Sequence, residues 1–600
     1  MRTDPLSLVD GFTALPLGVH SGVAATSLQP GQCSWAVNTT FRGGYARSRP
    51  GIKKHNLSCP ESFKWERFQG AGIYDSKDAA YMLLSAGGNL YKLDLQTMNM
   101  VQLNEPPDYN AANRQQTWFC QGEEFAVIRD GQSAPWIWDG AALRRSDTNT
   151  EVQAGTCMEY GMGRLWGASP NGRNFGAGDL VGGPSGTVAF QNRDAILKRE
   201  ENKFLGEGGA FSIGMNTGPI KAMRFVGNLD TSLGQGPLQV FTEGAVYGVN
   251  CPVDRLIWKD VTYPIQTISL IGNGALAQNS TILVNGDIWF RALDGIRSYQ
   301  IARRDFNSWV NAPMSAEVSR VLQKDDQRLL KYGSAVYFDN RVIFTCSPYQ
   351  RTVAGDSPPR WFHRGLVVID TLPTSGLTQR TSPAWEGLWT GPTILQILKA
   401  TVDGEERCFI IGHQGDANCL FELTKDDNFD TGSQGEQRIQ WWVEGPVAAF
   451  GSAGRAPMDL KSLDTGDVWV EDMVGTVDFS MAYRPDAQAC WWDWHSWQEC
   501  ATDRLCDMNC GPATEVRPQS RYRMRLPTPP EVCGPMGSMP PNKGYNFQPR
   551  ITITGKCTLK AVRLIAHQEA EDVVGECRSA NAECKLAECC HPDLFSYQIT

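Results

Sequence analysis

The sequence has no long apolar run. None of its 600 residues belongs to an uncharged apolar stretch of about 18 residues, the length that a membrane-spanning helix needs. The first residues, MRTDPLSLVDGFTALPLG, contain an early Asp and two prolines where a secretory signal has an apolar core. We therefore expect no membrane-spanning segment and a soluble protein made in the cytoplasm.

Basic charge is also scarce. The chain has 56 Lys and Arg against 65 Asp and Glu, a net charge of −9. Tight phosphate binding to nucleic acid depends on a surplus of basic side chains that release counterions. This balance argues against a protein that grips nucleic acid, although DNA could still pass through an assembly that does not hold it.

Short catalytic motifs are missing as well. The sequence contains no HExxH, GxxxxGK[ST] or GxSxG pattern, and its seven histidines have no metal-ligand spacing. We therefore predict no catalytic, cofactor-binding or metal-binding residue and no cofactor, and we do not expect an enzyme.

One loose match concerns nucleotides. Gly272-Asn-Gly274 follows an apolar strand, with Asp294 at about the distance of a ribose-binding acid. A dinucleotide site needs a helix of ten or more residues after the glycines, but here the next strand begins near Thr281. We interpret the segment as a β-turn.

A second loose match concerns calcium. Asp426, Asn428 and Asp430 have the spacing of a calcium loop, but the loop glycine is displaced to Gly432 and the bidentate glutamate is replaced by Gln437. We interpret residues 426–437 as a solvated linker.

The residues that are abundant favour strands. The chain has 60 Gly, 34 Pro, 19 Trp, 16 Tyr and 24 Phe, a composition typical of short aromatic strands joined by tight turns. Apolar strand, polar Gly, Asp or Asn turn and second strand recur along the chain. The predicted hairpins are Tyr81–Leu95, Glu124–Arg145, Pro237–Val249, Thr281–Tyr299, Ser334–Cys346 and Cys408–Leu423.

The turn spacing predicts a β-propeller. Gly88 and Gly131, and likewise Gly244 and Gly286, are separated by about the 40–50 residues of one four-stranded blade. The spacing fails between Gly131 and Gly244, where Asn171–Gly218 has the composition of an insertion loop. One helix is predicted over Ser315–Lys331, with an apolar face and a serine cap.

The expected fold class is all-β, a β-propeller with a C-terminal Cys-rich β-sandwich domain. The predicted organisation is an N-terminal arm with the first strands (1–60), the propeller with inserted loops and one helix (61–425), the linker (426–437) and the sandwich (438–600). Charge is segregated within the last domain, because Arg517–Arg563 is basic and Glu569–Asp593 is acidic. One of these stretches could pair with the other or with a neighbouring subunit.

Cysteines are concentrated at the C-terminal end. Eight of the 18 precede Cys490 and are spaced like single core residues, whereas ten lie between Cys490 and Cys590. The second group allows disulfides, reduced thiols, or a zinc site from Cys506, Cys510 and Cys584–His591. We predict at least two disulfides in this group, because its Pro-rich stretches bury little apolar surface.

A tryptophan-rich segment, Cys490–Cys500, holds Trp491, Trp492, Trp494 and Trp497. Exposed tryptophans form sugar-stacking platforms, but aromatic density in a β protein more often belongs to a core or a subunit interface. We favour the core or interface.

One segment carries a resemblance to a known family. Trp35–Gly51 reads WAVNTTFRGGYARSRPG, an Asn-containing strand, a Gly-Gly turn and an Arg-Pro-Gly stop. It resembles the N-terminal signature of phage tail nozzle proteins, the tail tubular protein B family of short-tailed phages. Gln132–Arg145 and Gly163–Leu180 are similar in style to phage propeller proteins. The resemblance extends loosely over about the first 420 residues and hardly reaches the C-terminal domain.

The resemblance implies a structural virion protein made in the host cytoplasm. In that family the chain forms a homo-oligomeric ring, a hexamer, at the distal end of the tail tube. Genome DNA passes through the lumen without sequence-specific binding, and the tail adaptor protein and tail fibres or spikes dock on the ring. No catalytic residue carries over from the family. The alternative is a receptor- or carbohydrate-binding β-propeller, either a lectin or a glycan-active enzyme with carboxylates converging on the propeller axis.

Overall fold

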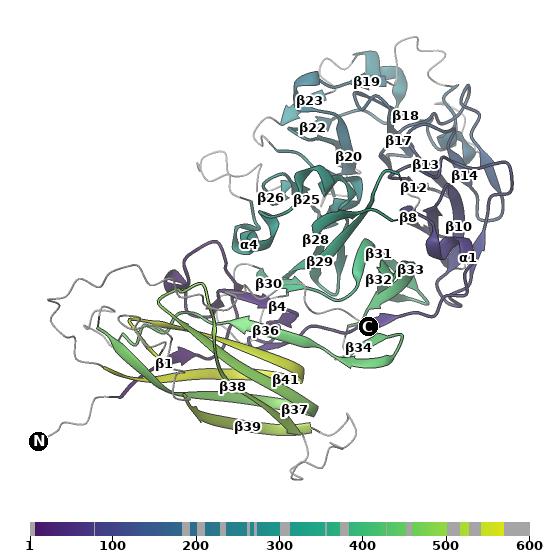
Figure 1. The fold of residues 1–600 in the computed structure, drawn as a ribbon. Coiled ribbons are helices and arrows are strands. Elements are labelled where there is room, and N and C mark those ends of the chain that lie inside the picture. The colour runs from purple at the N-terminus through teal and green to yellow at the C-terminus, as the bar shows by residue number, and fades with distance from the viewer. Residues whose placement is uncertain are drawn as a thin grey trace, which may run out of the picture.

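The computed structural model describes residues 7–76, 79–182, 193–200, 210–227, 236–260, 265–268, 273–299, 313–353, 357–372, 383–425, 427, 429–451, 459–500, 516–526 and 542–568. Strands make up most of this part of the chain, and they form two bodies (Figure 1). A ring of small sheets contains the part of the chain that runs from dark purple-blue through teal to the first green strands. A group of long green and yellow strands lies beside it. All-β architecture is therefore confirmed.

The ring is built from blades whose strands follow chain order in antiparallel sheets. The first two blades are β8 (Phe68–Asp75), β9 (Ala80–Ala86), β10 (Asn89–Asp94) and β11 (Met100–Gln102), then β12 (Trp118–Gly122), β13 (Phe125–Arg129), β14 (Trp136–Trp138) and β15 (Leu143–Arg145). The third and fourth are β16 (Met158–Gly161), β17 (Arg164–Ala168), β18 (Asn174–Ala177) and β19 (Ala210–Ser212), then β20 (Ile220–Phe225), β21 (Leu238–Thr242), β22 (Val246–Val249) and β23 (Ile265–Ile268).

Three further blades complete the ring. The fifth has β24 (Thr281–Val284), β25 (Asp287–Ala292) and β26 (Gly295–Ser298) among the described residues. The sixth is β27 (Ala335–Phe338), β28 (Arg341–Arg351), β29 (Arg360–Asp370) and β30 (Ala384–Trp389). The seventh is β31 (Thr393–Val402), β32 (Glu405–Gln414), β33 (Ala417–Leu423) and β7 (Ile52–Lys54), which comes from the N-terminal segment.

The inner strands close the ring in the described part of the chain. β8, β12, β16 and β20 contact one another in turn, β20 contacts the 3-10 turn that precedes β24, and β24, β27, β31 and β8 continue the circle. The last blade takes its outer strand from the segment that precedes the first blade, since Leu423 pairs with Ile52. The first and last parts of the propeller sequence therefore hold each other in place, giving a closed β-propeller with seven blades among the described residues.

The second body is a β-sandwich made from two long strands that bend. β37 (Lys461–Pro485) pairs antiparallel with β41 (Phe547–Gln568) along both halves of its length. β39 (Val516–Arg525) and β38 (Trp492–Cys500) pair with the first and second halves of β37, while β1 (Ser7–Phe12) and β36 (Gln440–Glu444) pair with β41.

The bend lies where the β37–β41 pairing shifts register. Asp472 and Gly475 in β37 have φ angles of 52° and 61°, and Gly555 in β41 has 124°. A Cβ added to Gly466 would lie 3.0 Å from the Trp494 ring and 3.1 Å from Met481 Cε, so the first half of β37 faces the second across the core. Each long strand therefore contributes to both layers of the sandwich.

Short strands and helices fill the remainder. The strands are β2 (Gly18–Val19), β3 (Gln32–Cys33), β4 (Trp35–Val37), β5 (Thr39–Thr40), β6 (Ala46–Ser48), β34 (Phe429–Gly432), β35 (Gly435–Arg438) and β40 (Lys543–Gly544). The α-helices are α1 (Glu61–Trp65) and α4 (Ser319–Leu322), and the 3-10 turns are η1 (Ala25–Ser27), η2 (Arg193–Leu197), η3 (Met215–Thr217), η5 (Arg255–Asp260), η6 (Gln278–Ser280), η7 (Ala316–Val318) and η8 (Gln327–Tyr332).

All six predicted hairpins are confirmed by strand pairings. The spacing of about 40–50 residues between turns compares turns that do not all occupy the same position in a blade. Gly88 and Gly131 both connect the second and third strands of a blade, but Gly286 connects the first and second strands of its blade. The expected insertion at Asn171–Gly218 is part of the third blade, since β18 and β19 lie within it and pair with each other.

Two sequence predictions are wrong. The helix predicted over 315–331 is divided into η7, α4 and η8, because the chain turns to bury Asp325, which accepts hydrogen bonds from the Ser347 amide and from Arg291. The linker predicted over 426–437 contains an antiparallel hairpin, β34–β35. Asp430 in that hairpin is fully buried, so this part of the segment is not solvated.

Candidate functional site

The segment that carries the family resemblance lies between the two bodies. Its strand β4 pairs with β30 of the propeller and with β36, and its strand β6 pairs with β41 of the sandwich. We call this region the junction, defined as Trp35–Gly51 with the propeller and sandwich residues that contact it. Both bodies pair with strands of the junction, which therefore sets their relative position.

Arg49 is the centre of the junction and has no solvent exposure. Its guanidinium donates to both carboxylate oxygens of Asp430, at 2.8 and 2.7 Å. It also donates to the carbonyl oxygens of Pro50 and Thr390 and, through Nε, to Asn38 Oδ1 at 3.1 Å. A buried guanidinium is costly unless its donors are paired, and here each nitrogen donates at least one hydrogen bond.

Asn38 extends this cluster toward the sandwich. Its φ angle is 52°, in the left-handed region, and its side-chain amide donates to Thr390 Oγ1 and to the Gln440 carbonyl oxygen. Gln440 begins β36, which leads the chain from the propeller into the sandwich. The Asn and Arg of the resembling segment are therefore structural residues that join three parts of the chain.

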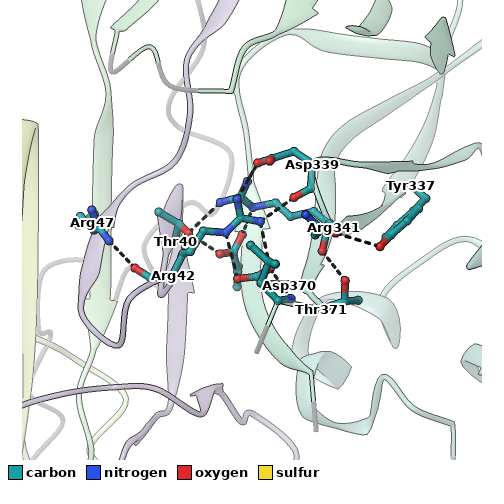
Figure 2. A network of polar contacts seen from close by, with 11 residues as sticks. Thr40, Arg42, Arg47, Tyr337, Asp339, Arg341, Asp370 and Thr371 are labelled. Carbon is teal, nitrogen blue, oxygen red and sulfur yellow. Dashed lines mark hydrogen bonds and ion pairs between the residues drawn. The ribbon is translucent and has the colours of Figure 1, made fainter. Parts of the chain in front are cut away.

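A second polar network surrounds Arg42 and Arg341 (Figure 2). Arg42 binds Asp339 at 2.7 Å and Asp370 at 3.1 Å. Asp339 precedes β28 and Asp370 is the last residue of β29, so Arg42 links the start of one strand to the end of its neighbour. Arg341 donates to Glu386 at 3.0 Å and also pairs with Asp339. Burial raises the pKa of Glu386, and the positive charge of Arg341 opposes that rise.

Indole groups complete the junction. Trp389 Nε1 donates to the Thr39 carbonyl oxygen at 3.0 Å, and Trp441 Nε1 donates to that of Gly555 at 2.9 Å. Both tryptophans are almost fully buried. The indoles thus fasten the resembling segment to the propeller, and β36 to the bend in β41.

A cleft of about 440 Å³ opens beside the junction. Its charged lining consists of the cations Arg42, Arg47, Arg341, Lys425 and Lys556 and the acids Asp427 and Asp472. Cations outnumber acids in this lining, which therefore favours anionic over cationic groups.

A second cavity, of about 430 Å³, lies where the inner strands of the propeller begin. Its lining includes Arg114, Lys221, Lys331 and the single acid Asp130. Asp130 accepts hydrogen bonds from Gln132 and Ser133 in its own turn. Burial, with the charge of Lys221 nearby, lowers the pKa of Lys331. Among its described lining residues, Asp130 is therefore without a second carboxylate of the kind that glycoside hydrolysis ordinarily uses.

The loose nucleotide and calcium motifs contain residues with structural roles. Gly274 approaches the backbone closely, because an added Cβ would lie 1.9 Å from the Thr242 carbonyl oxygen. It is followed by the short turn η6, so the dinucleotide helix is absent at this described position. Asp430 binds Arg49, whereas Asp426 and Asn428 lie outside the described residues.

The tryptophan-rich segment packs one tryptophan into the sandwich core and others, partly exposed, against it. Trp494 is buried, and Trp497 stacks on Phe479 with ring centroids 5.0 Å apart. Trp491 contacts the guanidinium groups of Arg484 and Arg550. These contacts favour the core interpretation over a sugar-stacking platform.

The cysteines divide as the sequence predicts. The eight upstream cysteines and Cys557 are free, whereas Cys490 and Cys500 are disulfide-bonded. Cys490 lies just before β38 and Cys500 is the last residue of that nine-residue strand, so the two are too far apart to bond to each other. Their partners, and the zinc candidates Cys506, Cys510 and Cys584–His591, lie outside the described residues.

The described residues contain neither a candidate metal-ligand cluster nor a candidate membrane-spanning helix. No group of three His, Cys, Asp or Glu side chains there is placed to hold a metal ion. None of the helices in the same residues is both long and apolar enough to cross a membrane.

The outer face of the sandwich carries several arginines. The sequence shows them only as part of the basic stretch Arg517–Arg563. Asp467 accepts hydrogen bonds from Arg521, Arg523 and Arg563 at 2.7 to 2.8 Å. Burial acts to raise the pKa of Asp467, but these hydrogen bonds outweigh it and hold the pKa well below its usual range. We call Arg521, Arg523, Arg525 and Arg563, with the partly exposed Trp469, the arginine face.

Comparisons with known proteins add no family. No family model matches the chain, and no curated protein is significantly similar to it. Solved structures with a similar arrangement include YCF48 bound to a D1 peptide (TM-score 0.32, 9% identity, covering 63% of this chain and 98% of that one). Another is the WD40 domain of Neurospora crassa Pan2 (TM-score 0.29, 9% identity, 60% and 90%). A third is exo-beta-1,3-galactanase from Phanerochaete chrysosporium (TM-score 0.22, 7% identity, 83% and 96%).

Proposed function

We propose that this chain is a structural virion protein of a bacteriophage tail, a nozzle subunit that forms a homo-oligomeric ring and extends the DNA-ejection channel. The observation that carries the proposal is the junction. The residues that resemble the nozzle signature, among them Asn38 and Arg49, hold the propeller against the sandwich through buried hydrogen bonds. A fixed angle between two bodies is what a ring subunit needs to meet its neighbours in one geometry.

The arginine face supplies a surface for such a contact. Arg521 and Arg523 have 53% and 60% of their side chains exposed, on the edge strand β39. Arginine and tryptophan are enriched at the centres of protein interfaces. A neighbouring subunit, the tail adaptor protein, or tail fibres or spikes with acidic surfaces would match its charge.

The charge balance fits a channel that lets DNA slide. A net charge of −9 provides no surplus with which to hold phosphates, so the genome is expected to pass without sequence-specific binding. The cavity where the inner strands begin has Asp130, engaged in its own turn, as the one acid among its described lining residues, which does not favour the alternative of a glycan-active enzyme. Of the tryptophans considered for a lectin, Trp494 is buried in the sandwich core and Trp497 stacks on Phe479.

Localisation in the particle tests the proposal. Gold-labelled antibody against this chain should bind purified phage particles at the distal end of the tail. Label on the capsid, or none on intact and disrupted particles alike, would overturn the proposal.

A further inference from the structure

A small cavity of about 70 Å³ lies between the second and third blades of the propeller. Its walls are the end of β13, the β15–β16 connection, β17 and β18, and the residue that follows the η2 region. Arg129 and Arg199 are its two charged lining residues, and no Asp or Glu lines it among the described residues.

Arg129 is the feature that the rest of the fold does not explain. It is 7% exposed, and its Nε and Nη1 atoms are buried without a hydrogen-bond partner. Space for the guanidinium is created by two glycines, because an added Cβ on Gly167 or Gly155 would lie 2.2 or 2.8 Å from Arg129 Nη1.

Two other buried arginines of this region donate hydrogen bonds to backbone carbonyl oxygens. Arg255 donates to the Ala177 carbonyl oxygen at 2.7 Å, and Arg164 donates to that of Gly178 at 3.0 Å. These two guanidinium groups are used to satisfy the backbone of β18 and its end. The Nε atoms of Arg164 and Arg255 also lack a partner, but Arg129 differs from both because its guanidinium donates no hydrogen bond within the described residues.

The second arginine adds charge of the same sign. Arg199 is half-buried, and Asp179 is the acid that interacts with it electrostatically. Asp179 is also paired with Arg255 and accepts a hydrogen bond from the Glu200 amide. Burial, with a contribution from Arg199, lowers the pKa of Arg129 to about 10. Two like charges in one small cavity oppose each other unless an anion lies between them.

We propose that Arg129 and Arg199 form a binding site for a small oxyanion of the size of inorganic phosphate. The planar guanidinium matches the geometry of phosphate and other oxyanions, and its donors form charge-assisted hydrogen bonds with them. Occupancy would place the anion between the two guanidinium groups that line the cavity and relieve the repulsion between the two cations. The site ties the second blade to the third, and the inference does not depend on the proposed function.

The test uses inorganic phosphate and the full chain. Phosphate should raise the midpoint of thermal unfolding by several degrees more than sodium chloride at equal ionic strength, and isothermal titration should give one site per chain. Arg199→Gln should weaken phosphate binding at least tenfold. The matched control is Arg328→Gln, which removes an 87% exposed arginine and should leave the affinity unchanged.

Arg129→Met supplies a second readout. Without phosphate this variant should be as stable as the wild type or more so, because it removes an unpaired buried charge, and it should lose the phosphate response. If Arg129→Met does not fold, the Arg199→Gln comparison decides alone. A phosphate response no larger than that of chloride, or one that Arg199→Gln retains in full, would overturn the proposal.

Discussion

Arg49 and Asp430 form a bidentate ion pair in which neither side chain is exposed, across 381 residues of sequence. The pair connects the segment that resembles the nozzle signature with the hairpin that follows the propeller. Because the surrounding cluster satisfies the guanidinium, removing one partner leaves an uncompensated charge inside the protein.

The junction prediction follows from that pair. Arg49→Met should lower the free energy of unfolding by about 3–5 kcal/mol, since Asp430 loses its partner in a buried site. Arg47→Ala, two residues earlier on the exposed side of β6, is the matched control and should cost less than about 1 kcal/mol. Urea unfolding followed by tryptophan fluorescence measures both. Equal effects of the two substitutions would show that the junction does not depend on Arg49.

The stability that closure of the propeller contributes is expected to depend on pH. Glu422 on β33 binds Arg407 and also His55, which follows the closing strand β7. Burial acts to raise the pKa of Glu422, but these hydrogen bonds outweigh it and lower the pKa from 4.5 to about 2. A depressed pKa stabilises the folded state above the unfolded value, and this stabilisation is lost as the pH falls toward the folded value.

Glu422→Gln should therefore destabilise the chain by about 2 kcal/mol at pH 5 to 6, and the difference from wild type should shrink between pH 4.5 and 3. Glu406→Gln is the control, because Glu406 pairs with Lys399 within one blade and both side chains are more than a third exposed. It should change stability by less than about 0.5 kcal/mol. A Glu422→Gln effect that does not vary with pH would contradict the role given to this carboxylate.

Disulfides can be counted directly. Labelling of denatured, unreduced protein with a thiol reagent should leave at least four of the 18 cysteines protected, because Cys490 and Cys500 belong to separate disulfides. The nine free cysteines of the described residues, including buried Cys557, should all react after denaturation. Labelling of all 18 would contradict the structure, and stoichiometric zinc in such a sample would favour the metal site instead.

Local pattern was sufficient for the hairpins. A strand such as Tyr81–Leu84, a Gly-Gly turn and an alternating strand specify their pairing within a few residues, so periodicity and turn chemistry predict them. The closing pair of Leu423 with Ile52 is of another kind, because its partners are distant in sequence and nothing local in either strand marks the other.

The contacts of the junction cannot be predicted from the sequence for a similar reason. Arg49 was noticed as part of an Arg-Pro-Gly stop, but its partner Asp430 was interpreted as one position of a failed calcium loop. Asp325 lies within the stretch predicted as one helix, whereas tertiary pairing with Arg291 buries it and divides that helix. Burial and long-range pairing decide the roles of these charged residues, and a single sequence shows neither.

Copy number in the particle tests the central claim most directly. Peptides of this chain can be quantified by mass spectrometry in purified phage particles, with the major capsid protein as the internal standard. The account predicts several copies per particle in the fixed number of one ring, six if the resemblance to the nozzle family extends to its stoichiometry. One copy per particle, or absence from purified particles, would contradict it.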